Sequence, residues 1–317
     1  MPPSSPSGSA TPAASLLHWF NHQAPLLLIL TTLIWGCNAV AARLAVGEIS
    51  PMMLTTARWS ICCVALWFTA RREIALHWHA LLPHWRYLAL MGTAGFTAFN
   101  ALFYTAAHHT TAINIAIIQG TIPVLVLLGG FLFMRLRARP LQLLGVFITL
   151  TGIAVVASRG DPAVLAALGF NIGDVWILIA SLLYAGYMLG LRRRPPVPPV
   201  VFFAAVAAVA SVASLPLLAL EVARGQFFVP TPTGWAIMLF VGLLPSFVSQ
   251  ITFIQAVSLI GPARAGVYLN LTPIFGPLLA VLVLGEPLAL YHGVALALVL
   301  GGIWIAEHRG QRPPRAP

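Results

Sequence analysis

Residues 112–134 read AINIAIIQGTIPVLVLLGGFLFM, and this stretch contains no charged side chain. An α-helix rises about 1.5 Å per residue, so a segment of this length crosses the roughly 30 Å hydrocarbon core of a bilayer. Hydrocarbon offers no hydrogen-bond partner to the backbone, which leaves the α-helix as the structure that satisfies every N–H and C=O group. We therefore predict a transmembrane helix here.

Similar apolar segments, separated by short loops, fill the chain on both sides of this one. Together they predict an all-α membrane protein with ten transmembrane helices. The predicted spans are residues 25–45, 51–70, 85–107, 112–134, 140–158, 173–191, 200–219, 234–257, 262–284 and 287–306.

The composition leaves no room for a soluble domain, because 59% of the residues are hydrophobic and only 8% are charged. Residues 1–20 are rich in Ser, Pro and Ala without periodicity, which predicts a disordered tail. They lack the basic n-region of a cleaved signal peptide. Cys37, Cys62 and Cys63 fall within predicted spans, where small-residue packing is expected rather than a disulfide.

The formal net charge is +10, and the 17 basic Lys or Arg residues are all arginines. In a soluble protein this charge would suggest nucleic-acid binding, but here four clusters of arginines gather in loops on one side of the predicted bundle, whereas Arg43, Arg159 and Arg224 on the other side are offset by carboxylates. The clusters are Arg71, Arg72 and Arg86; Arg135, Arg137 and Arg139; Arg192, Arg193 and Arg194; and Arg309, Arg312 and Arg315. By the positive-inside rule that side is the cytoplasm, so both termini, including the basic tail 309–317, are expected there and no nucleic-acid partner is expected.

An internal repeat becomes visible when the chain is shifted against itself by about 150 residues. The shift aligns Trp85 with Trp235, Gly92 with Gly242, Phe103 with Phe253, Pro123 with Pro273, and Gly152 with Gly302. We predict two five-helix repeats, residues 21–160 and 161–308. An odd number of spans gives the copies inverted topology, as in secondary transporters whose substrate site lies between the repeats near the bilayer midplane.

Two short motifs resemble the EamA-type members of the drug/metabolite transporter superfamily. The first is Ile34-Trp35-Gly36-Cys37-Asn38 followed by Pro51 and Arg58, and the second is Leu284-Gly285-Glu286-Pro287 before the Gly-rich last span. The resemblance covers residues 25–306 and implies a ten-helix exporter of amino acids or related metabolites. The first repeat departs from the family pattern, with Met134-Arg135 where members often carry a second Gly-Glu pair.

Charged residues inside the spans are few. None of the seven carboxylates lies in the middle of a span, which disfavours a fixed cation site or a carboxylate proton relay. Arg58 is the one clearly intramembrane charge, and its burial requires compensation. Two roles stay open: binding the carboxylate of a substrate, or a structural role in which Arg58 ties down helix ends through backbone carbonyls or extends outward to the interface.

Uncharged polar residues predict the substrate site. Asn100 and Gln119 are expected in the outer half of the membrane, and their repeat counterparts Gln250 and Asn270 in the inner half. Between these amide layers we expect aromatic and polar side chains that suit zwitterions with apolar or aromatic groups. The remaining predicted substrate-binding residues are Trp35, Asn38, Arg58, Tyr104, Tyr184, Tyr187, Gln255 and Tyr268.

Metal ions, cofactors and catalytic motifs are not expected. His77, His79 and His84 have no partners at metal-ligand spacing, so we predict no metal and no cofactor, while His108 and His109 are the candidates for proton coupling. A Walker-type loop is impossible without lysine, and the spans contain no nucleophile motif, which argues against a transport ATPase and against an intramembrane enzyme.

The sequence therefore predicts a secondary transporter that exports small metabolites by alternating access, most of all amino acids, bulky apolar or aromatic ones included. Sugar-phosphate, nucleotide-sugar and drug carriers of the same superfamily are the alternatives. The expected location is the bacterial inner membrane, the expected partners are a small-molecule substrate and the lipid bilayer, and the expected state is a monomer or weak homodimer.

Overall fold

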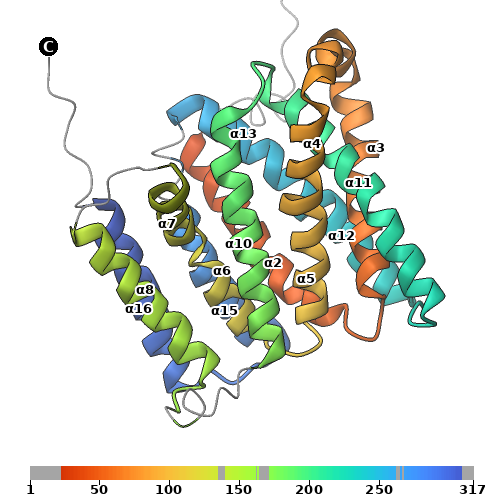
Figure 1. Cartoon of the computed structure of the whole chain (residues 1–317). Helices are drawn as coiled ribbons and strands as arrows, with labels where there is room; N and C mark the ends of the chain where they lie inside the picture. The colour runs from red at the N-terminus through yellow and green to blue at the C-terminus, as the bar shows by residue number, and fades with distance from the viewer. Residues whose placement is uncertain are drawn as a thin grey trace, which may run out of the picture.

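The computed structural model describes residues 23–134, 140–161, 163, 171–261, 265 and 268–308. Within these residues the regular structure is entirely helical, and the helices stand side by side in one bundle (Figure 1). Both predicted tails, the Arg135, Arg137 and Arg139 cluster, and the start of the ninth span lie outside the described residues.

Each of the ten predicted spans corresponds to a helix or to a run of joined helical pieces. The first repeat contains α2 (Ala24–Leu44), α3 (Pro51–His77), α4 (Trp85–Gly92) joined by η3 (Thr93–Ala98) to α5 (Phe99–Ala106), α6 (Ala112–Gln119) followed by α7 (Ile122–Met134), and α8 (Pro140–Ala157). The second contains α10 (Ile172–Gly190), α11 (Pro199–Ala223), α12 (Pro232–Leu243) joined by η5 (Leu244–Val248) to α13 (Ser249–Ile260), η6 (Leu269–Leu271) with α15 (Thr272–Leu284), and α16 (Leu290–His308).

Seven of the described helical segments are long and apolar enough to cross a membrane, and shorter apolar helices cover Leu269–Leu284 and Leu290–Ala306. The segment from Trp85 to Ala106 is interrupted only by a change of helix type. The protein is a multi-pass membrane protein, and the predicted all-α fold of two five-helix repeats is confirmed.

The two repeats share a specific irregularity. η3 and η5 are π-helical turns, and they lie at nearly the same position when the chain is shifted by 150 residues. A π-turn inserts one extra residue into a helix and is often found at functional sites. In the second repeat Pro245 lacks the N–H group that a regular helix would use, which favours the irregular turn. The repeats are thus matched in backbone geometry as well as in sequence.

Helices from opposite repeats pair at both edges of the bundle (Figure 1). α8 packs along α16, where a Cβ atom on Gly302 would lie 2.6 Å from the carbonyl oxygen of Gly145, so only glycine permits this approach. At the other edge α3 packs along α11, and the hydroxyls of Ser60 and Ser211 lie 2.8 Å apart. The remaining helices stand between these two pairs.

Two helices are longer than predicted. α3 continues to His77 instead of residue 70, and α11 continues to Ala223 instead of residue 219. The hydropathy criterion ends a span where charged residues begin, but an exposed helix can continue beyond the bilayer. His77 therefore lies at a helix end rather than in a loop, and Glu221 lies within α11, where it is buried.

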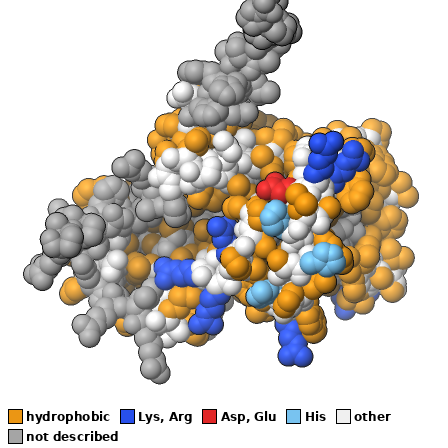
Figure 2. Space-filling model, turned by 90° about the horizontal axis from the view of Figure 1, so that it is seen from above, with side chains coloured by type: hydrophobic (Ala, Val, Ile, Leu, Met, Phe, Trp, Pro, Cys, Tyr) orange, Lys and Arg blue, Asp and Glu red, His pale blue; other side chains and the backbone are white. Residues whose placement is uncertain are grey.

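One end of the bundle carries exposed arginines and is called the arginine-rich end. Figure 2 looks onto this end and shows basic side chains spread across it. They come from the end of α3, the start of α4 and the end of α10. The exposed arginines concerned are Arg71, Arg72, Arg86, Arg192, Arg193 and Arg194. At the opposite end α5 turns into α6 and α15 turns into α16.

The inverted topology predicts the location of two loops. Reporter fusions truncated after residue 160 should report the periplasm, and fusions truncated after residue 194 should report the cytoplasm, because the positive-inside rule places the arginine-rich end in the cytoplasm. Paired phosphatase and fluorescent-protein fusions measure this directly. If both sites report the same compartment, the inverted-repeat topology is wrong.

Candidate functional site

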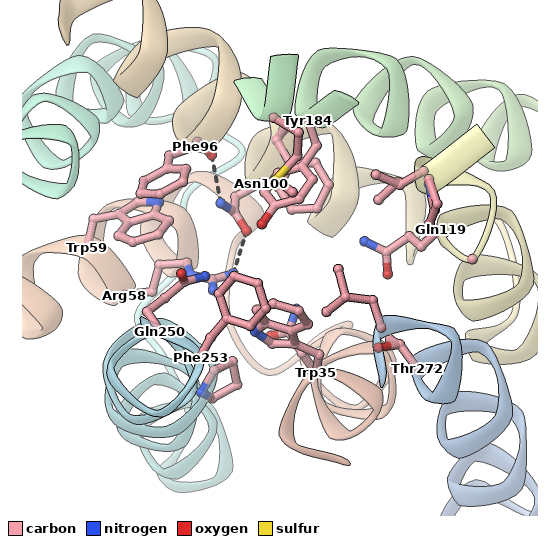
Figure 3. A pocket seen from close by; sticks show the side chains of 18 residues that line it. Trp35, Arg58, Trp59, Phe96, Asn100, Gln119, Tyr184, Gln250, Phe253 and Thr272 are labelled. Atoms are coloured by element: carbon pink, nitrogen blue, oxygen red, sulfur yellow. Dashed lines mark hydrogen bonds between the residues drawn. The ribbon is translucent and has the colours of Figure 1, made fainter. Parts of the chain in front are cut away.

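A central cavity lies between the two repeats, and eighteen described residues line it (Figure 3). Most of its wall is aromatic or aliphatic, with a few polar groups. The aromatic residues are Trp35, Trp59, Phe96, Phe99, Tyr184 and Phe253. The polar residues are Asn38, Arg58, Asn100, Gln119, Gln250 and Thr272. An apolar cavity with a few oriented polar groups is typical of a small-molecule site.

Arg58 is held in place by hydrogen bonds from both repeats. Its Nε atom donates to the Ser246 hydroxyl at 2.8 Å, and its Nη1 atom donates to the side-chain oxygen of Asn100 and to the Tyr104 hydroxyl, the latter at 2.6 Å. Tyr104 in turn donates to Asn38 at 3.2 Å. Only 4% of Arg58 is exposed, so these contacts fix the guanidinium in one orientation.

The π-turns supply part of this arrangement. Ser246 belongs to η5 and donates to the carbonyl of Val241, five residues earlier. Asn100 follows η3, and its amide nitrogen donates to the carbonyl of Phe96 inside that turn at 2.6 Å (Figure 3). The matched irregularities of the two repeats therefore position partners of Arg58 from two sides.

The Arg58 guanidinium keeps two N–H groups unused. A guanidinium has five N–H donors, and the three donors described above account for Nε and Nη1. The two donors on Nη2 have no hydrogen-bond partner among the described residues, and Arg58 lines the cavity. All three partners of Arg58 are neutral, so its positive charge is not balanced by a contacting carboxylate. Charge and free donors together suit a carboxylate ligand, which guanidinium binds through paired N–H groups.

Aromatic side chains form the rest of the wall. The Trp35 indole N–H donates to the Ser249 hydroxyl at 2.8 Å, and its ring lies 5.7 Å from that of Phe253. On the α10 side the ring of Tyr184 lies 5.0 Å from that of Phe99. Trp35 and Tyr184, from opposite repeats, thus both line the same cavity.

Trp59 and Phe96 form a second aromatic wall beside Arg58. Their rings stack at 4.4 Å with an angle of 5° between the planes, and the Arg58 guanidinium lies 5.1 Å from the Trp59 ring (Figure 3). A cation at this distance from a tryptophan is attracted by the negative face of the ring. This contact compensates part of the cost of burying Arg58.

Gln119 projects into the cavity from a break between two helices (Figure 3). α6 ends at Gln119 and α7 begins at Ile122, because Pro123 cannot donate a hydrogen bond to the carbonyl four residues before it. Gly120 allows this bend to pack closely, since a Cβ there would lie 2.6 Å from Pro273. The Gln119 amide has no hydrogen-bond partner among the described residues, so both its donor and its acceptor are available to a ligand.

The other predicted site residues lie outside the cavity lining. Tyr104 sits behind Arg58 as its hydrogen-bond partner, and Tyr187 packs behind the wall, 5.0 Å from Phe96 between ring centres. Tyr268 packs against the apolar cluster around Leu27 and Ala256. Gln255 and Asn270 are half-buried and do not line the cavity. The substrate-binding roles of all twelve residues stay predictions.

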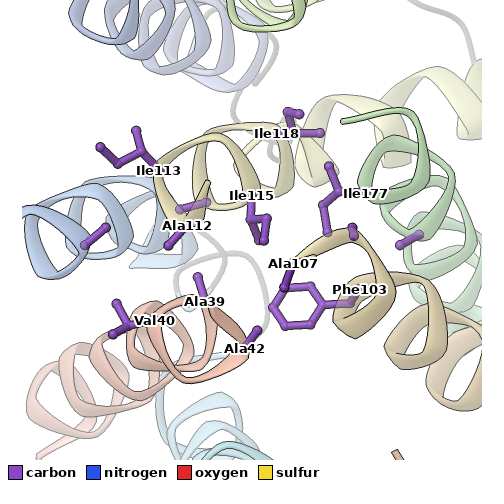
Figure 4. Packing of buried hydrophobic residues seen from close by; sticks show 14 of the residues in the cluster. Ala39, Val40, Ala42, Phe103, Ala107, Ala112, Ile113, Ile115, Ile118 and Ile177 are labelled. Atoms are coloured by element: carbon purple, nitrogen blue, oxygen red, sulfur yellow. The ribbon is translucent and has the colours of Figure 1, made fainter. Parts of the chain in front are cut away.

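At the end of the bundle opposite the arginine-rich end, tightly packed helices close the cavity. The segment Ala112–Ile118 of α6 is buried throughout, and its neighbours are the small residues of α2 and α15. A Cβ on Gly276 would lie 2.3 Å from the Cβ of Ala116, and a Cβ on Gly36 would lie 3.0 Å from that of Phe275. Figure 4 shows part of this cluster, with Ile113 and Ile115 of α6 above Ala39 and Val40 of α2.

Two carboxylates of the second repeat hold the start of α6. Glu286 accepts hydrogen bonds from the backbone N–H groups of Ala112 at 2.9 Å and Ile113 at 3.0 Å. Asp174 accepts from the Thr110 hydroxyl and the Asn114 amide. A carboxylate at a helix N-terminus satisfies free N–H groups and interacts favourably with the helix dipole. These contacts join the repeats at the opposite end, and the sequence motif containing Glu286 did not reveal its partner.

The cavity wall facing the arginine-rich end is less buried. Met188 near the end of α10, Gln250 and Phe253 on α13, and Leu269 at the start of η6 are all partly exposed, in contrast to the fully buried start of α6. Among the described residues, the cavity is therefore closed more tightly at the opposite end than at the arginine-rich end.

The described residues contain no group of three or more His, Cys, Asp or Glu side chains that could hold a metal ion. His108 and His109, the candidates for proton coupling, lie at the opposite end rather than in the cavity. Partial burial lowers the pKa of His108, and the neighbouring His109 and Arg43 lower it further, while Glu221 partly opposes this shift.

Comparison with known proteins identifies the family. A model of the EamA-like transporter family matches the chain twice, over residues 23–158 and 171–306. A solved crystal structure has the same fold, with a TM-score of 0.61 at 19% identity, and the match covers 91% of this chain and 99% of that one.

Several relatives match over nearly their whole length. An uncharacterized transporter of Archaeoglobus fulgidus is 24% identical, over 90% of this chain and 97% of its own. The uncharacterized inner membrane transporter YedA of Escherichia coli is 25% identical, over 84% and 85%. A probable terminal-alkyne amino-acid exporter of Streptantibioticus cattleyicolor is 25% identical, over 89% and 92%. The family resemblance seen in the sequence is confirmed, and the chain belongs to the EamA-like transporter family.

Proposed function

We propose that this protein is a secondary transporter that exports small metabolites, most of all amino acids with bulky apolar or aromatic side chains, across a bacterial inner membrane. The observation that carries the proposal is the Arg58 guanidinium, which is fixed by three neutral partners and directs two unused N–H groups to an apolar cavity. Arg58 binds the substrate carboxylate, while Trp35, Tyr184 and Phe253 contact the side chain.

Alternating access accounts for the unequal closure of the two ends. With the arginine-rich end in the cytoplasm, the structure corresponds to an inward-facing state in which α6, α2 and α15 close the outer side. The transition to an outward-facing state separates α6 from α15 and brings the inner ends of α7 and α13 together. The spans broken by π-turns or prolines, α4–α5, α6–α7, α12–α13 and α15, are the proposed moving helices.

The competing functions fit the cavity less well. A sugar phosphate or nucleotide sugar carries more negative charge than the single guanidinium in the described lining would balance. The described lining also has no carboxylate, histidine or cysteine to act as a general base or nucleophile, which favours a transporter over an intramembrane enzyme.

Flux through proteoliposomes tests the proposal. Purified protein reconstituted with a panel of labelled amino acids should exchange phenylalanine, tryptophan or leucine faster than protein-free vesicles do, and faster than it exchanges lysine or glutamate. Vesicles containing heat-inactivated protein provide the control for leakage. If none of the amino acids is exchanged above that control, the proposed amino-acid transport is wrong.

The aromatic wall predicts a size-dependent defect. Trp35→Ala should weaken the binding of phenylalanine by about 5- to 150-fold, because losing contact with a buried aromatic ring costs about 1 to 3 kcal/mol, whereas alanine binding should change much less. Trp35→Phe keeps a ring but loses the hydrogen bond to Ser249, and should retain most of the phenylalanine affinity. Equal losses for both amino acids in a normally folded Trp35→Ala protein would mean that this ring only packs.

A further inference from the structure

The cavity lining carries a positive charge without a negative partner, and this imbalance restricts which substrates fit it. Arg58 is the only charged side chain among the described residues of the lining, and no carboxylate accompanies it. A zwitterionic amino acid would bring one carboxylate that the site can pair and one ammonium group that it cannot. This observation concerns the substrate class and builds on the proposed function.

The buried or partly buried carboxylates are engaged elsewhere. Glu286 caps α6, and Asp174 binds Thr110 and Asn114. Glu221 accepts from Ser50 and from the N-terminal N–H groups of α3, and Glu48 accepts from Thr231. All of these contacts lie at the opposite end of the bundle, so these carboxylates are not available to an ammonium group in the cavity.

Two of the neutral acceptors near Arg58 are also occupied. The side-chain oxygen of Asn100 accepts from Arg58, and that of Asn38 accepts from Tyr104. Gln119, on the other side of the cavity, and Gln250 are the lining amides whose side-chain oxygens accept no hydrogen bond among the described residues, but neither oxygen carries a formal charge (Figure 3). Removing an ammonium group from water without a charged partner is costly, so this side of the cavity offers little compensation for it.

We infer that the preferred cargo is a monocarboxylate anion with an aromatic or bulky apolar body, and that the α-ammonium group of an amino acid is dispensable for recognition. A monocarboxylate neutralises Arg58 through Nη2 and places its apolar body against Trp35 and Phe253. When it binds, its carboxylate pairs with the Arg58 guanidinium, and it brings no ammonium group that would stay unpaired. An amine without a carboxylate lacks this pairing and meets the repulsion of Arg58.

Four compounds that share a benzyl group separate the contributions of the carboxylate and of the ammonium group to binding. They are phenylalanine, 3-phenylpropionate, phenylalaninol and phenethylamine, each used to compete with labelled phenylalanine for binding to the purified protein. Binding avoids the passive permeation of the uncharged forms of the acid and the amine. We expect 3-phenylpropionate to compete at least as well as phenylalanine, and the two compounds without a carboxylate to compete about 10- to 150-fold more weakly, since hydrogen bonds to charged groups contribute about 1.5 to 3 kcal/mol.

A charge substitution provides the matched test. Gln119→Glu keeps the size of the side chain and adds the anion that the described lining lacks, so it should shift the preference toward phenylalanine over 3-phenylpropionate by about tenfold or more. Gln119→Met, of similar size and uncharged, should leave the ratio close to that of the wild-type protein. The comparison is a ratio within one protein, so a moderate loss of stability does not affect it.

The outcomes distinguish this inference from the proposed function. Phenylalanine that binds at least tenfold more tightly than 3-phenylpropionate to the wild-type protein would overturn the inference while leaving amino-acid transport intact. Binding of phenethylamine equal to that of 3-phenylpropionate would overturn it as well. If none of the four compounds binds and phenylalanine is not exchanged, both the aromatic cargo and the proposed function are wrong.

Discussion

A Glu286→Ala variant is expected to open the end of the bundle opposite the arginine-rich end. The substitution removes both hydrogen bonds that the carboxylate accepts from the N-terminus of α6 and leaves those N–H groups without their cap. Loss of a cap and of the dipole interaction costs about 1 to 3 kcal/mol, which shifts the conformational equilibrium by about 5- to 150-fold. A cysteine replacing the fully buried Ile115, in a background lacking the native cysteines, should then react faster with a membrane-impermeant maleimide.

Glu221 supplies a matched control for this experiment. It also caps a helix at the opposite end, accepting from Met52 at 3.1 Å and Met53 at 3.3 Å at the start of α3. α3 and α11 pack along each other at the edge of the bundle, so Glu221→Ala should lower stability without exposing Ile115→Cys. Equally increased labelling in the Glu286 and Glu221 variants would show general unfolding, and unchanged labelling in both would refute the role of Glu286 in closing that end of the bundle.

Arg58→Gln should abolish most of the binding of carboxylate substrates. The expected loss of affinity is about 10- to 150-fold, because hydrogen bonds to charged groups contribute about 1.5 to 3 kcal/mol. Arg58→Lys retains the charge but not the planar fork, and should restore only part of the affinity. Isothermal titration of the folded variants with phenylalanine measures both effects.

Arg43 is the control for the loss of a buried or partly buried cation. Its Nη1 atom donates to the carbonyl of Ala107 at 2.6 Å, at the opposite end and outside the cavity lining. Arg43→Gln should therefore reduce thermal stability with little change in affinity. If Arg58→Gln also lowers only the stability and folded protein binds phenylalanine normally, then Arg58 is a structural residue.

Much of the fold can be predicted from the hydropathy of the sequence and from its internal repeat. Uninterrupted apolar segments fix the spans, and the shift of 150 residues, marked by pairs such as Gly152 and Gly302, predicts the inverted repeats. Gly302 then meets α8 at one edge of the bundle, where no larger residue fits. The ends of α3 and α11 were not predicted correctly, since hydropathy does not sense a helix that continues into water.

The site was only partly predictable, for a physical reason. Polarity inside a span marks Arg58, Asn100 and Gln119 as candidates, but it does not tell whether each amide serves a ligand or a neighbour. Asn100 serves Arg58, whereas Gln119 faces the cavity without a partner. Ser246 was missed because a single serine in an apolar helix gives no distinguishing signal until the π-turn directs it toward Arg58.

The most direct test of the account is a high-resolution structure of the protein in lipid nanodiscs with phenylalanine bound. We expect the carboxylate oxygens within hydrogen-bond distance of Arg58 Nη2, the phenyl ring against Trp35 and Phe253, and no carboxylate side chain at the ammonium group. A ligand bound outside the central cavity, or bound within it with its ammonium group toward Arg58 and Nη2 still unpaired, would contradict the account.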